Sequence, residues 1–146
     1  MNERKKTVRC LVPSLILAGF VASTHAHEVS VPDPGLNAAI REALQKPIGP
    51  LTDQDLLSLT NLDASRRNVR SIDGLEAARN LVSLDLQINR LTNFSLPAQL
   101  TNLMALDLSV NPLTNISLPN GLVHLTSLVL ENDGIRNLTL PADWLG

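Results

Sequence analysis

Aromatic side chains are almost absent from this sequence of 146 residues, which has two Phe, one Trp and no Tyr. Hydrophobic residues nevertheless make up 44% of the chain, and 29 of its residues are leucine. With only 7 Gly and 9 Pro, this composition excludes a disordered or collagen-like protein. The length fits one domain, and its core must be built mainly from leucine.

Cysteine is also scarce, because Cys10 is the only one and it lies in a stretch with the features of a signal peptide. A mature chain without cysteine has no disulfides, no thiolate nucleophile and no cysteine metal ligands. His27 and His124 are too far apart in sequence to form a metal-binding pair. We find no Ser-His-Asp order, P-loop, glycine fingerprint or metalloprotease motif. We therefore expect no metal, no cofactor and no enzyme activity.

An excess of positive charge is missing as well, since the formal net charge is −2. Proteins that bind nucleic acid need a basic surface, so we expect no nucleic-acid partner. The apolar run 11–21 is shorter than the ~20 residues that a membrane-spanning helix needs.

A secretory signal peptide explains that apolar run. It follows four basic residues and is followed by Thr24-His25-Ala26, a small-x-small end. We predict a Sec-type signal peptide over residues 1–26, a periplasmic or extracellular location, and no stable membrane insertion after cleavage. An uncleaved anchoring N-terminus is the alternative. Residues 1–26 carry four of the 12 basic and one of the 14 acidic residues, so the mature net charge is about −5.

A repeat of 22 residues accounts for the leucines. Four units occupy residues 59–146 and follow the pattern Leu-x-x-Leu-x-Leu-x-x-Asn-x-Leu. They begin at Leu59, Leu81, Leu103 and Leu125, and their ninth places hold Arg67, Asn89, Asn111 and Asp133. We number the places of each unit from its first leucine. The last three units also contain a Leu-Pro pair.

Each place of the repeat has a physical meaning. The alternation Leu84-Asp85-Leu86 predicts a short strand with the leucines inward, and successive units would stack such strands into a parallel sheet at ~4.8 Å. The ninth-place Asn can satisfy backbone groups as the chain turns away. Residues 92–96 alternate again, which predicts a second short strand, or a 3₁₀ turn, on the convex side. The expected fold is an α/β solenoid with a concave parallel sheet.

Residues 27–58 do not repeat and are expected to form an N-terminal linker and helical cap. Asp33 before Pro34 predicts a helix start, and Pro47 is expected to stop that helix. Leu36, Ile40 and Leu44 would lie on its buried face. The segment 52–55 resembles a capping box, which predicts a second, shorter helix to about Ser58.

These features are similar to bacterial internalin-like leucine-rich repeat proteins. The resemblance rests on the 22-residue period and on the segments 32–44 and 51–56, and it covers about residues 32–146. It implies recognition of a protein by the concave face, usually at the cell surface. The chain has no immunoglobulin-like domain after the repeats and no cell-wall sorting signal, and its convex segment carries Ser-Leu-Pro. Only a generic binding role is therefore implied.

Candidate binding residues are those that the strands would turn outward. The fifth place holds Asp63, Asp85, Asp107 and Val129. The three carboxylates are candidates for binding a cation or a basic partner, or they are solvated repeat residues. Apolar residues on or beside this face are candidates for a protein contact, or scattered surface residues: Val82, Ile88, Met104, Val110 and Val129.

Two further groups of residues are candidate sites for which a purely structural role is the alternative. The cluster Arg66, Arg67 and Arg70 is a candidate anion site or a solvated rim next to the cap. Asn93, Asn115 and Asn137 each begin an Asn-x-Ser/Thr pattern, which marks either a glycosylation acceptor or a turn residue.

We expect a secreted repeat module that binds a protein, or another polymer, through its concave face. The alternative is a truncated fragment of a larger surface or adhesin-type repeat protein with no independent activity. No closing cap follows the fourth repeat, so its open end is a candidate for end-to-end self-association.

Overall fold

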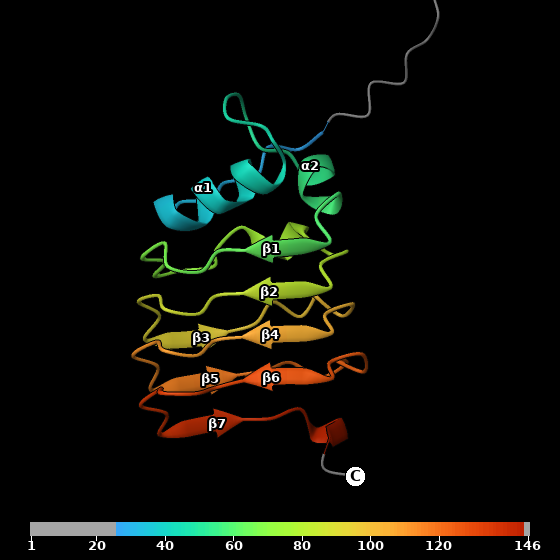
Figure 1. Cartoon of the computed structure of the whole chain (residues 1–146). Coiled ribbons are helices and arrows are strands. Elements are labelled where there is room, and N and C mark those ends of the chain that lie inside the picture. Colours follow the sequence, from blue (N-terminus) through green and yellow to red (C-terminus); the bar gives the residue numbers. More distant parts are fainter. Residues whose placement is uncertain (1–25, 145–146) are drawn as a thin grey trace, which may run out of the picture.

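The computed structural model describes residues 26–144, and residues 1–25 of the expected signal peptide lie outside this part. The described part contains two α-helices, seven strands and two 3₁₀ helices (Figure 1). The helices are α1 (Pro34–Ala43) and α2 (Asp53–Leu57), and the 3₁₀ helices are η1 (Leu75–Ala77) and η2 (Ala142–Trp144). The strands are β1 (Asn61–Asp63), β2 (Ser83–Asp85), β3 (Asn93–Ser95), β4 (Ala105–Asp107), β5 (Asn115–Ser117), β6 (Ser127–Val129) and β7 (Asn137–Thr139). None of the described helices is long and apolar enough to cross a membrane.

The first sheet confirms the predicted repeat. Its strands are parallel in the order β1-β2-β4-β6, one from each unit, and they pair with a register of one 22-residue unit. The central leucines Leu62, Leu84 and Leu106 point inward and are 2% exposed or less. Figure 1 shows the four strands stacked above one another, with α1 and α2 over the β1 end.

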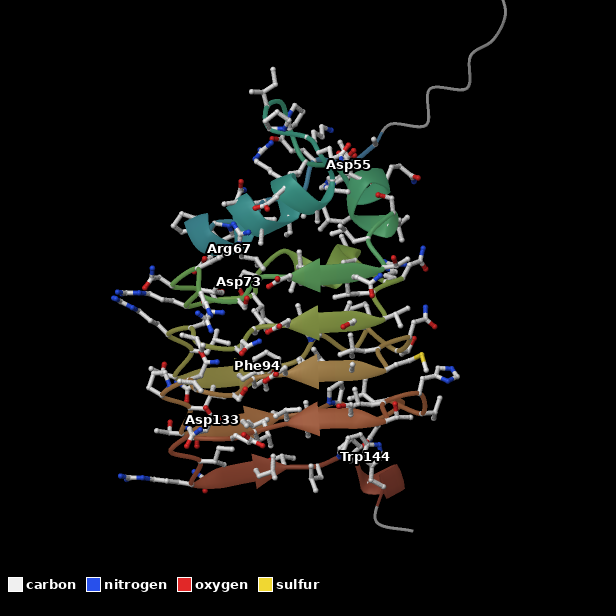
Figure 2. All side chains as sticks on the ribbon, in the orientation of Figure 1. Asp55, Arg67, Asp73, Phe94, Asp133 and Trp144 are labelled. Carbon is white, nitrogen blue, oxygen red and sulfur yellow. The ribbon has the colours of Figure 1, made fainter. Side chains whose placement is uncertain are left out.

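A second sheet lies on the opposite side of each coil and confirms the predicted convex strand in units two to four. Its parallel order is β3-β5-β7. Phe94 and Ile116 point inward and are 3% and 2% exposed, and Figure 2 shows Phe94 between the two sheets. The first unit has no strand at this place among the described residues. Its Arg70 and Ser71 N–H groups donate to the Asp33 carboxylate instead, at 2.8 and 3.3 Å.

The core between the sheets is made largely of leucine, as the composition predicted. Leu86, Leu91, Leu103 and Leu108 are 1% exposed or less. Each such side chain contributes about 1.5 to 3 kcal/mol by leaving water. Burial decreases in the last unit, where Leu128 and Leu130 are half-buried and Leu138 is 44% exposed.

The ninth-place asparagines connect successive coils, as their place in the repeat predicted. The Asn89 Oδ1 accepts from the N–H groups of Arg67 and Val69, both at 3.0 Å. Its Nδ2 donates to the carbonyl oxygens of Ala64 and Leu86. Asn89 is 7% exposed, so losing these bonds would leave several buried backbone groups unsatisfied.

Helix α1 begins as predicted but ends earlier. Asp33 caps it by accepting from the Leu36 N–H at 3.0 Å, and Pro34 follows. The sequence predicted Pro47 as the stop, yet the last helical residue is Ala43. Gln45 has a φ of 52°, and the N–H groups of Gln45 and Lys46 donate back into the last turn. This arrangement is a Schellman motif, which closes the helix before the proline.

The predicted capping box is present in α2. Thr52 Oγ1 accepts from the Asp55 N–H, and the Asp55 carboxylate accepts from the Thr52 N–H. The Lys46 ammonium lies 2.6 Å from Asp55 Oδ2 and holds the pKa of that carboxyl below its usual value.

Helix α1 packs closely on the first coil. A Cβ on Gly35 would lie 2.2 Å from the Arg67 carbonyl oxygen, so only glycine fits there. The Arg67 guanidinium forms an ion pair with Glu42 at 2.6 Å, and Figure 2 shows Arg67 beneath the helix. Arg67 therefore contacts the cap, whereas the sequence suggested an anion site or a solvated rim.

Candidate functional site

The outer face of the first sheet carries the residues that were predicted to bind a ligand. Asp63, Asp85, Asp107 and Val129 lie in register on β1, β2, β4 and β6. They form one column across the sheet, which we call the fifth-place column. It is flanked by small or polar third-place residues: Asn61, Ser83, Ala105 and Ser127.

The carboxylates of this column also shape the turn that follows each strand. The Oδ1 atoms of Asp63, Asp85 and Asp107 accept from backbone N–H groups two residues later, at 2.9 to 3.0 Å. The Ser109 hydroxyl also donates to Asp107. Hydrogen bonds from Ser65 hold the pKa of Asp63 below its usual value. The three aspartates therefore stabilise the turns and still present negative charge outward.

Of the predicted apolar residues, Val129 belongs to the fifth-place column, and the other four form two groups on opposite sides of it. Val82 and Met104 precede β2 and β4, and the Met104 N–H donates to the Val82 carbonyl oxygen at 2.8 Å. Ile88 and Val110 follow the same strands. Met104, Ile88 and Val110 are 46%, 38% and 44% exposed, whereas Val82 and Val129 are half-buried.

The eighth-place turn has a left-handed backbone in every coil. The φ angles are 58° at Arg66, 55° at Ile88, 58° at Val110 and 57° at Asn132. Glycine and Asn adopt this region readily, but a β-branched residue does not. Sequence reasoning missed this conformation, although Asn132 at the same place was a signal for it.

A half-buried carboxyl with one buried oxygen is the second feature that the sequence did not reveal. Asp133 occupies the ninth place of the last coil, where Figure 2 labels it at the turn after β6. Its Oδ1 accepts from the Asn111 N–H at 2.7 Å, but its buried Oδ2 has no hydrogen-bond partner. Burial, together with the charge of Asp107, raises the pKa of Asp133.

The aspartates do not gather into a metal centre. Among residues 26–144, no group of three or more His, Cys, Asp or Glu side chains is placed to hold a metal ion. Nothing in the geometry therefore adds support to the cation alternative for the fifth-place column.

The three Asn-x-Ser/Thr patterns lie on the second sheet, on strands rather than turns. Asn115 Nδ2 donates to Asn93 Oδ1 and Asn137 Nδ2 donates to Asn115 Oδ1, both at 2.6 Å. The amides are exposed and form a continuous ladder. A hollow of about 490 Å³ lies over this ladder and is lined by the second sheet and by Arg70 to Asp73.

The fold and its repeat define the class of this protein, which is a leucine-rich repeat solenoid. The chain matches no protein-family model and no curated protein sequence. Solved structures do match it. The internalin inlF from Listeria monocytogenes is 28% identical over 77% of this chain and 37% of its own, with a TM-score of 0.53.

Two other solved structures are less similar in shape. Internalin C2 from the same organism is 22% identical, with a TM-score of 0.45, over 72% of this chain and 67% of its own. The structure of CBM51-2 in complex with GlcNAc and INT domains of ZmpB from Clostridium perfringens is 32% identical, with a TM-score of 0.45. That match covers 53% of this chain and 16% of the other. The chain thus spans less than two fifths of inlF and about a sixth of the ZmpB structure. With the repeat and the inlF likeness, the chain is an internalin-like leucine-rich repeat protein.

Proposed function

We propose that this protein is a secreted binding module that recognises a protein ligand through the outer face of its first sheet. One observation carries the proposal. The register of the sheet places the fifth-place column on adjacent strands, with exposed apolar side chains on both sides of it. Exposed apolar side chains that gather on one face of a protein are typical of protein interaction sites.

The arrangement favours binding over catalysis. The carboxylates of this face are already engaged by turn N–H groups, at 2.9 to 3.0 Å. The similarity to inlF agrees with a binding role, although this chain spans 37% of that protein.

A pair of bulky substitutions tests the binding face. Ala105→Arg places a long side chain at the centre of the first sheet, and Ser117→Arg places the same side chain on the central strand of the second sheet. We expect the unmodified chain and the Ser117→Arg variant to be cross-linked to the same partner proteins, which mass spectrometry identifies. The Ala105→Arg variant should not be cross-linked to these proteins. Circular dichroism checks that both variants fold.

Two results would contradict this proposal. One is an unchanged set of cross-linked proteins with Ala105→Arg. The other is a loss that is equal for both variants, because it would show that the first sheet has no special role.

Secretion is the second part of the proposal and rests on the basic start, the apolar run and the small-x-small end of residues 1–26. When the full chain is expressed in a bacterium, we expect export and a mature protein that begins at His27, as read by N-terminal sequencing. A cytoplasmic product that retains Met1 to Ala26 would exclude the signal peptide. An exported but uncleaved product would favour the anchoring alternative.

A further inference from the structure

The eighth-place turn requires a left-handed backbone whatever its side chain is. The Ile88 N–H donates to the Ser109 carbonyl oxygen at 2.9 Å, and the Val110 N–H donates to the Glu131 carbonyl oxygen at 2.7 Å. The Arg66 N–H makes the same bond to Gln87 at 3.0 Å. These bonds extend the ladder between coils beyond the strands, and they use only backbone atoms. The side chain at this place is therefore free to vary.

Isoleucine and valine are poor choices for such a place. Their branched Cβ crowds the backbone at positive φ, and a β-branched residue in this region is a genuine outlier. Asparagine tolerates the same conformation, as Asn132 does one coil further on. Ile88 and Val110 thus strain the turn in two successive coils.

Ile88 and Val110 leave much of their apolar surface in water despite this strain. They are 38% and 44% exposed, and neither is among the buried residues of the core. By contrast, Leu91 and Leu113, three residues further along each coil, are 1% exposed or less. The two branched side chains therefore keep a strained backbone while more than a third of each remains exposed to water.

The charges around the pair indicate the chemistry of a partner. Asp85 and Asp107 lie on the strands that lead into Ile88 and Val110. Glu131 follows on the next coil. On the basic side, Arg90 follows Ile88 by two residues, and Arg66 and Arg67 lie in the same turn of the first coil, where Arg67 is paired with Glu42. An occupant of this surface would gain from apolar side chains flanked by Lys or Arg.

We infer that Ile88 and Val110 are the central contact residues for a basic protein segment with alternating apolar side chains. This inference rests on the proposed function and specifies the partner of that same face. The two side chains project from neighbouring coils, ~4.8 Å apart, so they present one apolar ridge beside two carboxylates. The strain is retained because the contact is made outside the molecule, in the complex.

The first test measures stability, because replacing the two branched side chains should stabilise the folded protein and at the same time weaken its binding. The double variant Ile88→Asn, Val110→Asn keeps the backbone bonds and relieves the strain, so its Tm should rise by several degrees. Val123→Asn is the matched control, since it removes an apolar side chain that is 74% exposed at a residue without positive φ. Its Tm should not rise. A lower Tm for the double variant would show that the pair supports the fold, and it would overturn the inference.

Binding provides the second test, with short synthetic peptides as probes and fluorescence anisotropy as the measurement. A peptide of alternating Lys and Leu should bind the full chain, and the double Asn variant should weaken this binding about ten-fold or more. Peptides of alternating Lys and Ser, or Glu and Leu, should bind much more weakly. Asp85→Asn with Asp107→Asn should reduce the salt dependence of the Lys-Leu binding. Equal Lys-Leu affinity for the double Asn variant and the unmodified chain would overturn the inference, as would tighter binding of the Glu-Leu peptide.

The two proposals fail in different ways. Suppose that Ala105→Arg abolishes the cross-linking of proteins while the double Asn variant leaves it unchanged. The first sheet is then the binding face, as proposed, but Ile88 and Val110 are not its central contact residues. If Ala105→Arg has no effect on cross-linking, the proposed function itself is wrong.

Discussion

At the scale of single residues, the ninth place of the repeat shows how one atom changes the energetics of a coil. Asn111 Nδ2 donates to the carbonyl oxygens of Leu86 and Leu108. One coil further on, Asp133 has an oxygen in place of that nitrogen, and the buried Oδ2 is left without a partner. An ionised carboxylate cannot donate to a carbonyl, whereas a protonated one can. Burial, together with the charge of Asp107, raises the pKa of Asp133, so the shift needs no catalytic role.

The substitution Asp133→Asn should therefore stabilise the protein at neutral pH. It restores the amide donor that coils two and three have at this place, with an expected gain of about 1 to 3 kcal/mol in the free energy of unfolding. Because the folded pKa of Asp133 is raised, the folded state binds this proton more tightly than the unfolded chain. The stability it brings is present below the ordinary value of 3.8 and is lost as the pH rises through the folded pKa.

The advantage of Asp133→Asn over the unmodified chain should consequently be largest at neutral pH, decrease as the pH falls through the folded pKa, and be smallest below pH 3.8. Urea unfolding at both pH values measures it. The charge of Asp107 faces this carboxyl and contributes to the shift, so Asp107→Asn should reduce the pH dependence. A difference that is constant with pH would show that Asp133 does not titrate in this range.

At the scale of elements, the sequence predicted those features that repeat or that depend on neighbouring residues. The strands followed from the 22-residue register, and the two helix starts followed from Asp33-Pro34 and from the capping box at Thr52. Features that depend on contacts distant in sequence were not predictable. The first unit lacks its second-sheet strand because Asp33 binds backbone N–H groups 37 and 38 residues away.

The end of α1 was missed for a different reason. Proline is visible in a sequence, whereas a Schellman motif with Gln45 in the left-handed region has no sequence signal, because glycine usually occupies that place. The candidate site likewise has features that the sequence predicted and features that it did not. Its columns were predictable from the period, but the positive φ of Ile88 and Val110 and the orphaned oxygen of Asp133 are properties of the folded backbone.

The helix end also gives a prediction. Gln45→Gly should stabilise the protein by about 1 kcal/mol, because glycine adopts the required φ without a Cβ conflict. Gln54→Gly is the control, since Gln54 lies within α2, where glycine should destabilise by a similar amount. Thermal unfolding of both variants measures whether each one is more or less stable than the unmodified chain. Destabilisation by Gln45→Gly would mean that the Gln side chain stabilises the turn by more than the strain costs.

At the scale of the whole molecule, the leucine content and the scarcity of aromatic residues have one explanation. A narrow coil of constant cross-section accepts the same medium-sized side chain at each inward place, and Phe94 is the single larger exception in the described core. Composition therefore indicated a leucine core, and the 22-residue repeat predicted the architecture around it. It could not predict the ligand, because the outward places are free of the packing constraint that makes the inward places regular.

The in-register pairing of both sheets also has an evolutionary meaning. Coils two and three are linked to their neighbours by equivalent bonds, from Asn89 to Ala64 and from Asn111 to Leu86. An in-frame duplication of one 22-residue unit at this point would find the same neighbours above and below it. Such a change would lengthen the ligand-facing surface by one strand at once, without redesigning the core. Recombination within genes for this fold can thus change the length of the ligand-facing surface. Point substitutions at the outward places change which ligand that surface binds.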